Sequence, residues 1–471
     1  MARWIRTLLV ALVAACLLPA AAIARPLAGQ VRVAIDGAVY KADFSKTASR
    51  ANVVILQSWE LDKLRKLKAA DPSIKVLMYR NLSAMSRADR GGNTGTGVTV
   101  QDAERHPEWF LHNTRGERFT FSGYGFLWAA DIGNRAYQEQ WVANTLAKLK
   151  TGEWDGAFVD DANPTMRYHY DVASVAKYPS DAAYQAATGS ALALIGPRLR
   201  AQGKLVIPNF GDWRRYRSAV TPWLKYVSGG MEEHFTKFGD SPREGHFTGA
   251  DWDDQLAVLK QVQSMGKLFL GVSHSSSGDR AAARYGWATM LLAADGSASF
   301  ALHHDYADET FFPEYRYDLG APKGKESKDA DGVHRRVFQR GLVLVNPTLE
   351  SRTVRFGGRY RGSGLGTAGS TVMRPHTGLV LLSASARPTA RKGKRVRAHR
   401  SVRIRVACRQ HAQPCRRVIT LAVRAQRRPV VVGRRKVTVR RTVRVRVRLS
   451  AKGHAAIKHG RRLRVSVRAR R

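Results

Sequence analysis

Between residues 31 and 305, short apolar runs alternate with longer segments in which apolar residues recur at helical spacing. Near-continuous apolar runs are typical of parallel strands buried on both faces, and the amphipathic segments are typical of helices that cover such a sheet. The predicted strands are 53–58, 75–80, 127–132, 156–161, 204–209, 226–233, 267–273 and 297–303. The predicted helices are 60–70, 137–150, 181–202, 255–265 and 280–293.

Eight strands with helices between them predict the α/β class and, within it, a (β/α)8 TIM barrel over residues 31–320. The alternative is an open, doubly wound parallel sheet. Such sheets often carry a glycine-rich phosphate-binding turn after the first strand, and no such turn follows residues 53–58. The barrel is therefore the favoured interpretation.

The pattern changes after Asp305, where charged and Gly-rich turns separate shorter apolar runs. These runs predict a small antiparallel β-domain over residues 332–383, packed on the barrel. Its predicted strands are 335–345, 353–356, 370–373 and 378–382.

The last part of the chain has a different character again. Residues 384–400 combine Ser, Ala, Pro and charge without apolar periodicity, as a linker does. Short strands return at residue 401, and residues 443–449 alternate strictly between apolar and cationic side chains. Residues 401–471 are therefore predicted to form a C-terminal, Arg-rich β-sandwich-like module.

The N-terminus has the pattern of an export signal. Arg3 and Arg6 precede an apolar run that ends in a small-residue cleavage site at Ala24. We therefore expect a signal peptide over residues 1–24 and a secreted or cell-wall-associated protein. The alternative is a lipid anchor on Cys16, because residues 13–16 resemble a bacterial lipobox. No other stretch is long and apolar enough to cross a bilayer, so no transmembrane segment is predicted in the mature chain.

The chain has three cysteines, and Cys16 falls within the predicted signal. Cys408 and Cys415 remain as an even pair in an exported protein, which predicts one disulfide. No zinc-binding pattern of Cys and His surrounds them.

The formal net charge of +42 is unevenly distributed. Residues 387–471 contain 31 Lys and Arg and no Asp or Glu, which leaves +11 for residues 1–386. Such a tail predicts either binding to anionic cell-wall polymers, acidic polysaccharide or lipid headgroups, or a structural module with an Arg-rich outer face. Specific nucleic-acid binding is disfavoured, because the chain is expected to be exported and the tail has no aromatic residues between its cations.

In a barrel, the functional site forms at the carboxyl ends of the strands. Several predicted strands deliver acids, amides and aromatic rings there. Because sugars have apolar ring faces, Trp and Tyr beside acids are typical of carbohydrate sites. The predicted substrate-binding residues are Trp59, Tyr79, Asn81, Trp128, Asp131, Asn209, His274, His303 and Asp305.

Hydrolysis of a glycosidic bond needs two carboxyl groups, one to protonate the leaving oxygen and one to attack carbon or activate water. The doublets Asp160–Asp161 and Glu232–Glu233 end two strands that face each other across a barrel mouth. Adjacent strand residues point to opposite faces, so one member of each doublet is expected inside. We predict Asp160 as nucleophile and Glu233 as acid, with Asp161 and Glu232 as secondary candidates.

Metal or cofactor chemistry is not predicted. His303, His304 and Asp305 are adjacent, but neighbouring His side chains on a strand diverge, and no third ligand follows at a typical spacing. The expected site therefore depends on carboxylates alone.

The sequence resembles the hypothetical glycosyl hydrolases, in particular glycosyl hydrolase-like family 15, over residues 35–383. The resemblance rests on Asp155–Asn163 (DGAFVDDAN) and on residues 229–235 (GGMEEHF), 106–110 (HPEWF), 130–134 (ADIGN), 341–347 (GLVLVNP) and 375–378 (PHTG). It implies a TIM barrel, a glycosidase activity, and catalytic carboxylates at the fourth and sixth strand ends, which match Asp160 and Glu233. The tail resembles basic β-modules appended to exported actinobacterial proteins.

Two functions remain open from the sequence. The first is a secreted glycoside hydrolase that cleaves a polysaccharide with two carboxylates. The second is a non-catalytic glycan-binding barrel, presented at the cell wall by the basic tail. Both use the same ring of polar and aromatic residues, and only the first predicts turnover.

Overall fold

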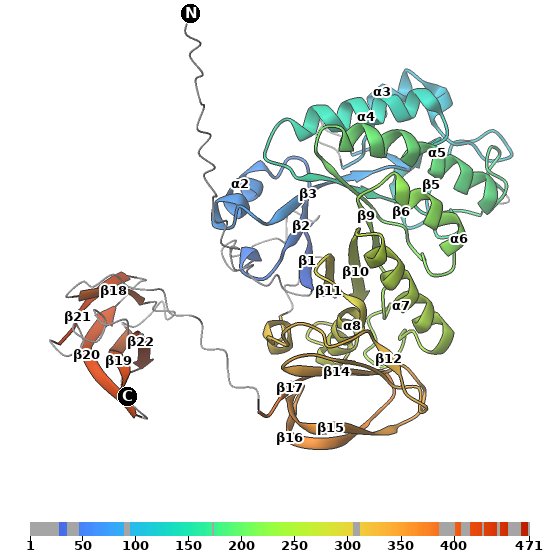
Figure 1. Ribbon diagram of the computed structural model, residues 1–471. Helices are drawn as coiled ribbons and strands as arrows, with labels where there is room; N and C mark the ends of the chain where they lie inside the picture. Colours follow the sequence, from blue (N-terminus) through green and yellow to red (C-terminus); the bar gives the residue numbers. More distant parts are fainter. Residues whose placement is uncertain are drawn as a thin grey trace, which may run out of the picture. The chain divides into compact units, whose positions relative to one another are not determined.

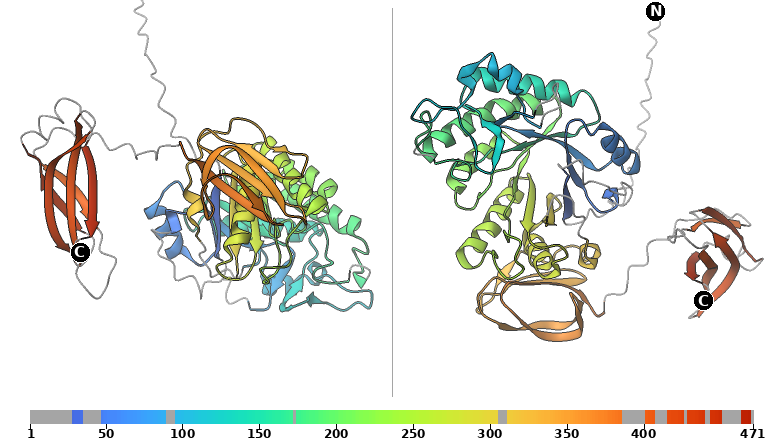
Figure 2. Two further views of the ribbon diagram at one scale, coloured as in Figure 1. Left: turned by 90° about the horizontal axis from the view of Figure 1, so that it is seen from below. Right: turned by 180° about the vertical axis from the view of Figure 1, so that it is seen from behind.

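The computed structural model describes residues 28–34, 47–88, 95–171, 174–304, 311–385, 401–406, 415–425, 428–439, 443–450 and 463–469. The chain divides into two compact units, Met1–Ala386 and Arg387–Arg471, which Figures 1 and 2 show from three sides. The predicted signal peptide, Cys16, Asp305, Cys408 and residues 386–400 lie outside the described residues. The Cys408–Cys415 disulfide therefore stays a prediction.

Eight parallel strands form the central sheet of the first unit, in the order β8-β7-β3-β2-β1-β11-β10-β9. The two end strands meet at an isolated parallel bridge between Asn209 and Met231. The arrangement is TIM-barrel-like, as the alternation of apolar runs predicted. The strands are β1 (Gly29–Ala34), β2 (Val53–Leu56), β3 (Lys75–Asn81), β7 (Gly156–Asp160), β8 (Leu205–Pro208), β9 (Gly229–Glu232), β10 (Leu268–His274) and β11 (Ala298–His303).

Alternate residues of these strands pack into two apolar layers. One layer faces the inside of the sheet and contains Val33, Ile55, Phe158 and Met231. The intervening residues, such as Val54, join the larger core beneath the helices. Because both faces are buried, the strands have near-continuous apolar sequences.

Helices cover the outside of the sheet (Figure 1). Four of them begin at a side chain that accepts backbone N–H groups, namely Thr99, Asn134, Ser180 and Asp279. The longer helices are α2 (Leu61–Ala70), α4 (Arg135–Leu149), α5 (Asp181–Arg200), α7 (Gly249–Ser264) and α8 (Arg280–Ala293). The shorter ones are α3 (Val100–Glu104), α6 (Arg217–Val220), η1 (Pro107–Trp109), η3 (Thr221–Lys225) and η4 (Pro313–Arg316).

One predicted barrel strand, 127–132, was wrong. The chain there forms β6 (Tyr124–Ala129), which pairs antiparallel with β4 (Ala84–Ser86) and β5 (Thr120–Phe121) in a separate three-stranded sheet. The eighth barrel strand is instead β1. It was not predicted from the sequence because Arg32 interrupts its apolar run. Asp131 and Trp128 therefore do not lie on a barrel strand.

A six-stranded antiparallel sheet completes the first unit, in the order β12-β13-β14-β17-β15-β16. It packs against α8, where the Arg336 guanidinium donates hydrogen bonds to the carbonyls of Leu291 and Ala294 (Figure 1). The predicted strand 335–345 is in fact two strands joined by a turn. The strands are β12 (Ser327–Lys328), β13 (His334–Val337), β14 (Gly341–Asn346), β15 (Arg352–Gly362), β16 (Leu365–Met373) and β17 (Thr377–Ser383).

The second unit is built from β-strands alone in the part of it that is described. A two-stranded sheet pairs β18 (Ser401–Val406) with β21 (Val443–Arg448). A three-stranded sheet has the order β20-β19-β22, and Figure 2 shows its long strands running side by side. These are β19 (Cys415–Ala425), β20 (Arg428–Val439) and β22 (Leu463–Ala469). The two sheets share a core of Val406, Ile419, Leu421, Val432, Val445 and Val447.

Candidate active site

The carboxyl ends of the parallel strands bring polar side chains from distant parts of the sequence together. A small cavity at this edge has an apolar floor, to which Phe158 and Met231 contribute, and a polar rim. The rim consists of Asp160 at the end of β7, Asn209 after β8 and Glu233 after β9. Asp160 and Glu233, the two acids expected inside, thus line the same cavity.

The Asn209 side chain joins these two carboxylates. Its amide nitrogen lies 3.0 Å from Asp160 Oδ1 and 2.8 Å from Glu233 Oε2. Because both neighbours are carboxylates, the nitrogen and not the oxygen of the amide faces them. One side chain therefore sets the spacing of the two acids.

The other oxygen of Asp160 accepts a hydrogen bond of 2.6 Å from the Tyr79 hydroxyl, which comes from β3. Burial, followed by the negative charges of Asp161 and Glu233, raises the pKa of Asp160 to about 7. The pKa of Tyr79 is raised well above its usual value by burial and then by the charges of Asp160 and Asp161. The site therefore retains a proton near neutral pH.

Asp161 also turns toward the mouth, because its backbone adopts the left-handed conformation with φ of 52°. Its carboxylate accepts hydrogen bonds from Asn81 (2.6 Å) and Asn163 (3.2 Å), and lies 3.1 Å from His169 Nε2. Burial lowers the pKa of His169, but the hydrogen bond and charge of Asp161 outweigh it, so this pKa lies above its usual value.

Glu232 and Glu233, by contrast, separate to opposite faces of the sheet. Glu232 is fully buried, and burial raises its pKa to about 7, although the hydrogen bond from the backbone N–H of His234 and the charge of Arg214 lower it. Its Oε2 finds no hydrogen-bond partner among the described residues. Glu233 is 27% exposed, and its Oε1 lies 3.7 Å from Nε2 of His274.

Two neutral imidazoles flank Glu233. Burial lowers the pKa of His234 and of His274, and the negative charge of Glu233 opposes this shift in both. His234 also packs against Phe238, with ring centroids 4.0 Å apart. Glu233 thus has two imidazoles and, beyond His234, the ring of Phe238 as neighbours.

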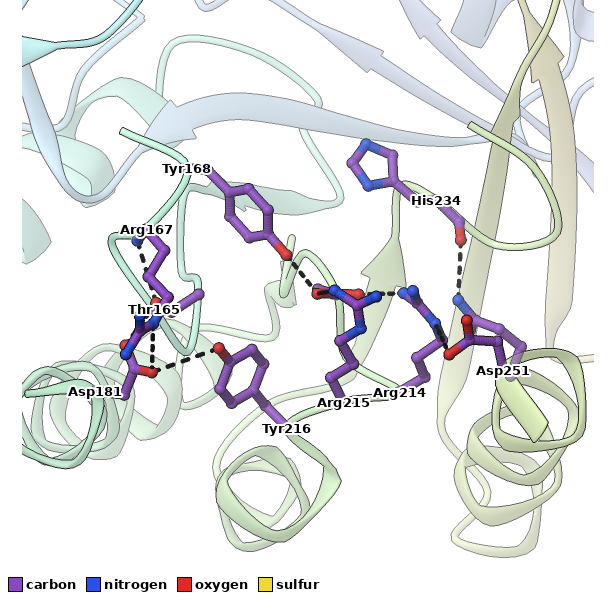
Figure 3. Close-up of polar contacts among 11 residues, drawn as sticks. Thr165, Arg167, Tyr168, Asp181, Arg214, Arg215, Tyr216, His234 and Asp251 are labelled. Atoms are coloured by element: carbon purple, nitrogen blue, oxygen red, sulfur yellow. Dashed lines mark hydrogen bonds and ion pairs between the residues drawn. The ribbon is translucent and has the colours of Figure 1, made fainter. Parts of the chain in front are cut away.

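A nearly buried ion pair follows Asn209 in the chain, and Figure 3 shows its Arg214 with Tyr168, Asp251 and His234 nearby. Asp212, whose backbone has φ of 50°, pairs with Arg214 and accepts a hydrogen bond from the Tyr168 hydroxyl. Arg214 extends the network to Asp251 at 3.2 Å. Two nearly buried charges bonded on several sides hold the turn after Asn209 in one conformation.

The remaining predicted site residues lie in different surroundings. Asp131 is buried and bonded to Lys177 and Tyr178, so it belongs to a separate polar cluster. The ring of Trp128 is covered by Arg87, whose guanidinium carbon lies 3.9 Å from its centroid. Trp59 follows β2 at the carboxyl edge and is 45% exposed.

Asn81 and His303 are both buried at the same edge of the sheet. Asn81 bonds Asp161, as described above, and so supports the cavity rim. The ring centroid of His303 lies 6.5 Å from that of His274, in the neighbouring strand β10.

Several exposed aromatic side chains near the mouth were missed by the sequence prediction. Tyr124 is 51% exposed. Its pKa is raised by burial and, to a smaller extent, by the charges of Glu233, Asp161 and Asp160, so it lies close to the three acids. Phe238 is 52% exposed beside His234. Phe126 and Tyr168 are similarly exposed. They come from β6 and from loops, so strand periodicity gave no signal for them.

The described residues contain no group of three or more His, Cys, Asp or Glu that could hold a metal ion. Of the helices in the described part of the chain, none has the length and apolar character that crossing a bilayer requires.

A parallel TIM-barrel-like sheet with acids and aromatic rings at its carboxyl edge defines the class of barrel proteins with a carbohydrate-type site. The chain belongs to the hypothetical glycosyl hydrolase family 15, whose model matches residues 68–342. Family membership supports a glycosidase and implies a carbohydrate substrate. No curated protein sequence matches the chain.

Solved structures of similar shape include three glycoside hydrolases. The glycoside hydrolase domain of PelA from Pseudomonas aeruginosa is 13% identical over 60% of this chain and 96% of that chain, with a TM-score of 0.41. The maltogenic α-amylase AmyB from Thermotoga neapolitana is 11% identical over 75% and 98%, with a TM-score of 0.44. The GH31 dextranase from Flavobacterium johnsoniae is 9% identical over 76% and 52%, with a TM-score of 0.46.

Proposed function

We propose that this protein is a glycoside hydrolase that cleaves a polysaccharide with Asp160 and Glu233, which face each other in a closed (β/α)8 barrel. The observation that carries the proposal is the Asn209 amide, which bonds both carboxylates at 3.0 and 2.8 Å. A structural role alone does not account for two acids held by one donor above a cavity, because their mutual repulsion destabilises the fold.

The two acids take different roles in this proposal. Asp160 is held on both oxygens, by Tyr79 and Asn209, and is fixed for attack on the anomeric carbon. Glu233 is more exposed and protonates the leaving oxygen as the glycosidic bond breaks. Water deprotonated by Glu233 then hydrolyses the glycosyl ester on Asp160.

The spacing of the acids favours retention of anomeric configuration. Because one nitrogen bonds an oxygen of each carboxylate, these two oxygens are at most about 6 Å apart. Retaining enzymes separate their carboxyl groups by about 5–5.5 Å, whereas inverting enzymes need about 6.5–9.5 Å to admit a water. The proposed reaction therefore passes through a covalent glycosyl–enzyme intermediate.

The aromatic rings near the mouth support a sugar-binding role. Tyr124 lies close to all three acids, and Phe238 packs against His234, the neighbour of Glu233. Exposed rings beside a pair of acids are suited to stacking against sugar faces. We include Trp59 in this binding surface and leave out Trp128 and Asp131, whose side chains are engaged elsewhere.

The proposed location is outside the cytoplasm. The basic, apolar and small-residue pattern of residues 1–24 supports export, with cleavage near Ala24 or lipidation of Cys16 as the two alternatives. Mass spectrometry of the protein released by its native host distinguishes a new N-terminus near Arg25 from a diacylglyceryl-cysteine at position 16.

The test of the proposed activity is release of reducing ends from a panel of polysaccharides. Asp160→Asn and Glu233→Gln should each lower the rate by about 10³-fold or more, because each removes an essential group. Proton NMR of the first product should show the anomer present in the substrate.

The matched control is Glu232→Gln, which changes the neighbouring, buried acid and should keep the rate within a few-fold of wild type. Glycan binding that survives both cavity substitutions, with no release by the wild type on any polymer, would instead support the glycan-binding barrel. Equal losses in all three variants would contradict the assignment of Glu233.

A further inference from the structure

The second unit is unusually cationic and has a restricted choice of side chains. Residues 387–471 contain 26 Arg and 5 Lys, and no Asp, Glu, Phe, Tyr or Trp. Its cations therefore have no acidic side chain within the unit to pair with. It also has no Phe, Tyr or Trp ring on which a neutral sugar or a nucleic-acid base could stack.

The strands sort these residues by face. In β21, Val445 and Val447 are buried in the core, whereas Arg446 and Arg448 are exposed. The alternation of the sequence thus becomes an apolar inner face and a cationic outer face. Three further exposed cations, Arg434, Arg435 and Lys436, lie in succession on β20.

The strand register places cations opposite one another. Between β18 and β21, Arg403 is paired with Arg446, and Arg405 with Arg444. Like charges at directly opposite positions of an antiparallel pair destabilise it. The register thus brings arginines of the two strands to opposite positions of the ladder, where an anionic chain along the pair would meet several cations.

We propose that the second unit binds an anionic glycopolymer, a chain of sugar or polyol units with repeating phosphate or carboxylate groups. The excess of Arg over Lys favours such groups, because the guanidinium can bond two oxygens of a phosphate or carboxylate at once. The absence of Phe, Tyr and Trp disfavours neutral glycans and single-stranded nucleic acids. This binding is independent of the proposed hydrolase activity, since it needs none of the residues of the first unit.

The experiment measures binding of the full-length protein to immobilised poly(glycerol phosphate) and polygalacturonate, with dextran and duplex DNA as comparison polymers. We expect binding to one or both anionic glycopolymers at about 150 mM salt, and none to dextran. Preference between the two anionic glycopolymers identifies phosphate or carboxylate as the group that is recognised. The logarithm of the affinity should fall linearly with the logarithm of the salt concentration.

The test variant carries Arg434→Gln, Arg435→Gln, Lys436→Gln, Arg446→Gln and Arg448→Gln. Each neutralised contact should reduce the salt slope by up to about one, and affinity at about 150 mM salt should fall by at least tenfold. The matched control neutralises five exposed cations of the first unit, with the same change in net charge, at Arg65, Lys75, Arg105, Arg115 and Arg135.

A second variant with Lys at the four Arg positions keeps the charge and tests the fold. It should retain the wild-type salt slope, and its circular dichroism spectrum should match that of wild type. The proposal is overturned if neither anionic glycopolymer binds, if dextran binds equally well, or if the five-Gln variant binds like the matched control. Binding of duplex DNA without binding of either glycopolymer would make the partner a nucleic acid and would also overturn it.

Discussion

The two acidic doublets at the barrel mouth have similar sequences and different structures. Asp160 and Asp161 both face the mouth, because the left-handed backbone of Asp161 reverses the usual alternation. Glu232 and Glu233 keep the alternation, so one is buried beside Arg214 and the other lines the cavity. The comparison shows that the backbone conformation of the first residue after the strand decides how many acids reach this site.

The two doublets also hold protons for different reasons. The pKa of Asp160 is raised by burial together with two neighbouring negative charges, and Asp160 still has two hydrogen-bond donors. The pKa of Glu232 is raised chiefly by burial, and one of its oxygens has no partner in the described structure. Removing the proton should therefore affect catalysis in the first doublet and folding stability in the second.

The largest expected effect is on stability, in the Glu232→Gln variant. The folded-state pKa of Glu232 is raised from 4.5 to about 7, so its contribution to stability is complete below about pH 4.5 and is lost as the pH rises through 7. Glutamine stays neutral, so the variant should gain up to about 3 kcal/mol over wild type at pH 8 and little at pH 4. Urea unfolding at the two pH values measures this difference.

The matched control is Glu153→Gln, which alters an exposed side chain and should leave the pH dependence of unfolding as in wild type. A Glu232→Gln variant with the wild-type pH dependence would show that Glu232 is ionised and paired in the folded protein. The two doublets would then not differ in the way described.

A smaller effect is expected on the pH dependence of activity, in the Asp161→Asn variant. Asp161 raises the pKa of Asp160, which has to be ionised to attack. Loss of the Asp161 charge should therefore shift the rise in rate with pH, near pH 7 in wild type, to lower pH by roughly one unit. Asn tolerates the left-handed backbone, although its amide nitrogen replaces an oxygen that accepts hydrogen bonds. A pH–rate profile measures the shift, and Asp62→Asn on the exposed face of α2 serves as control. An unshifted profile would mean that Asp161 does not act on Asp160.

The smallest effect concerns the exposed aromatic rings near the mouth. Tyr124→Ala and Phe238→Ala should each weaken substrate binding by about 1 kcal/mol, which raises KM roughly fivefold with little change in kcat. Leu349→Ala, at a 72%-exposed residue of the small β-domain, is the control. An effect of only one ring would place the substrate beside that ring alone.

Much of the fold follows from the sequence because burial on both faces leaves a clear pattern. The helix 280–293 agrees with α8 at both ends, and six of the eight predicted barrel strands lie within two residues of observed ones. The failures have local causes. Arg32 breaks the apolar pattern of β1, so this strand was not predicted. The apolar run at 127–132 belongs partly to an antiparallel sheet, in which the partner strand β4 is distant in the chain.

The site was less predictable than the fold. Strand alternation indicated that one member of Glu232–Glu233 faces inward, and the structure has Glu233 at the cavity. Strand alternation gave the wrong expectation for Asp161, because the sequence does not indicate that a non-glycine residue adopts the left-handed conformation. Tyr124 and Phe238 lie on a hairpin and a loop, where no periodicity relates a residue to the barrel mouth.

Arg336 gives the small β-domain a role beyond its own folding. Its guanidinium donates hydrogen bonds to two carbonyls at the end of α8, because the last carbonyls of a helix have no partner within the helix. A chain cut between η4 and β13 would lose the Arg336 guanidinium at the end of α8. It would also expose the apolar side of α8 to water. The shortest fragment that keeps the barrel intact should therefore extend through β17, some eighty residues past the last barrel strand.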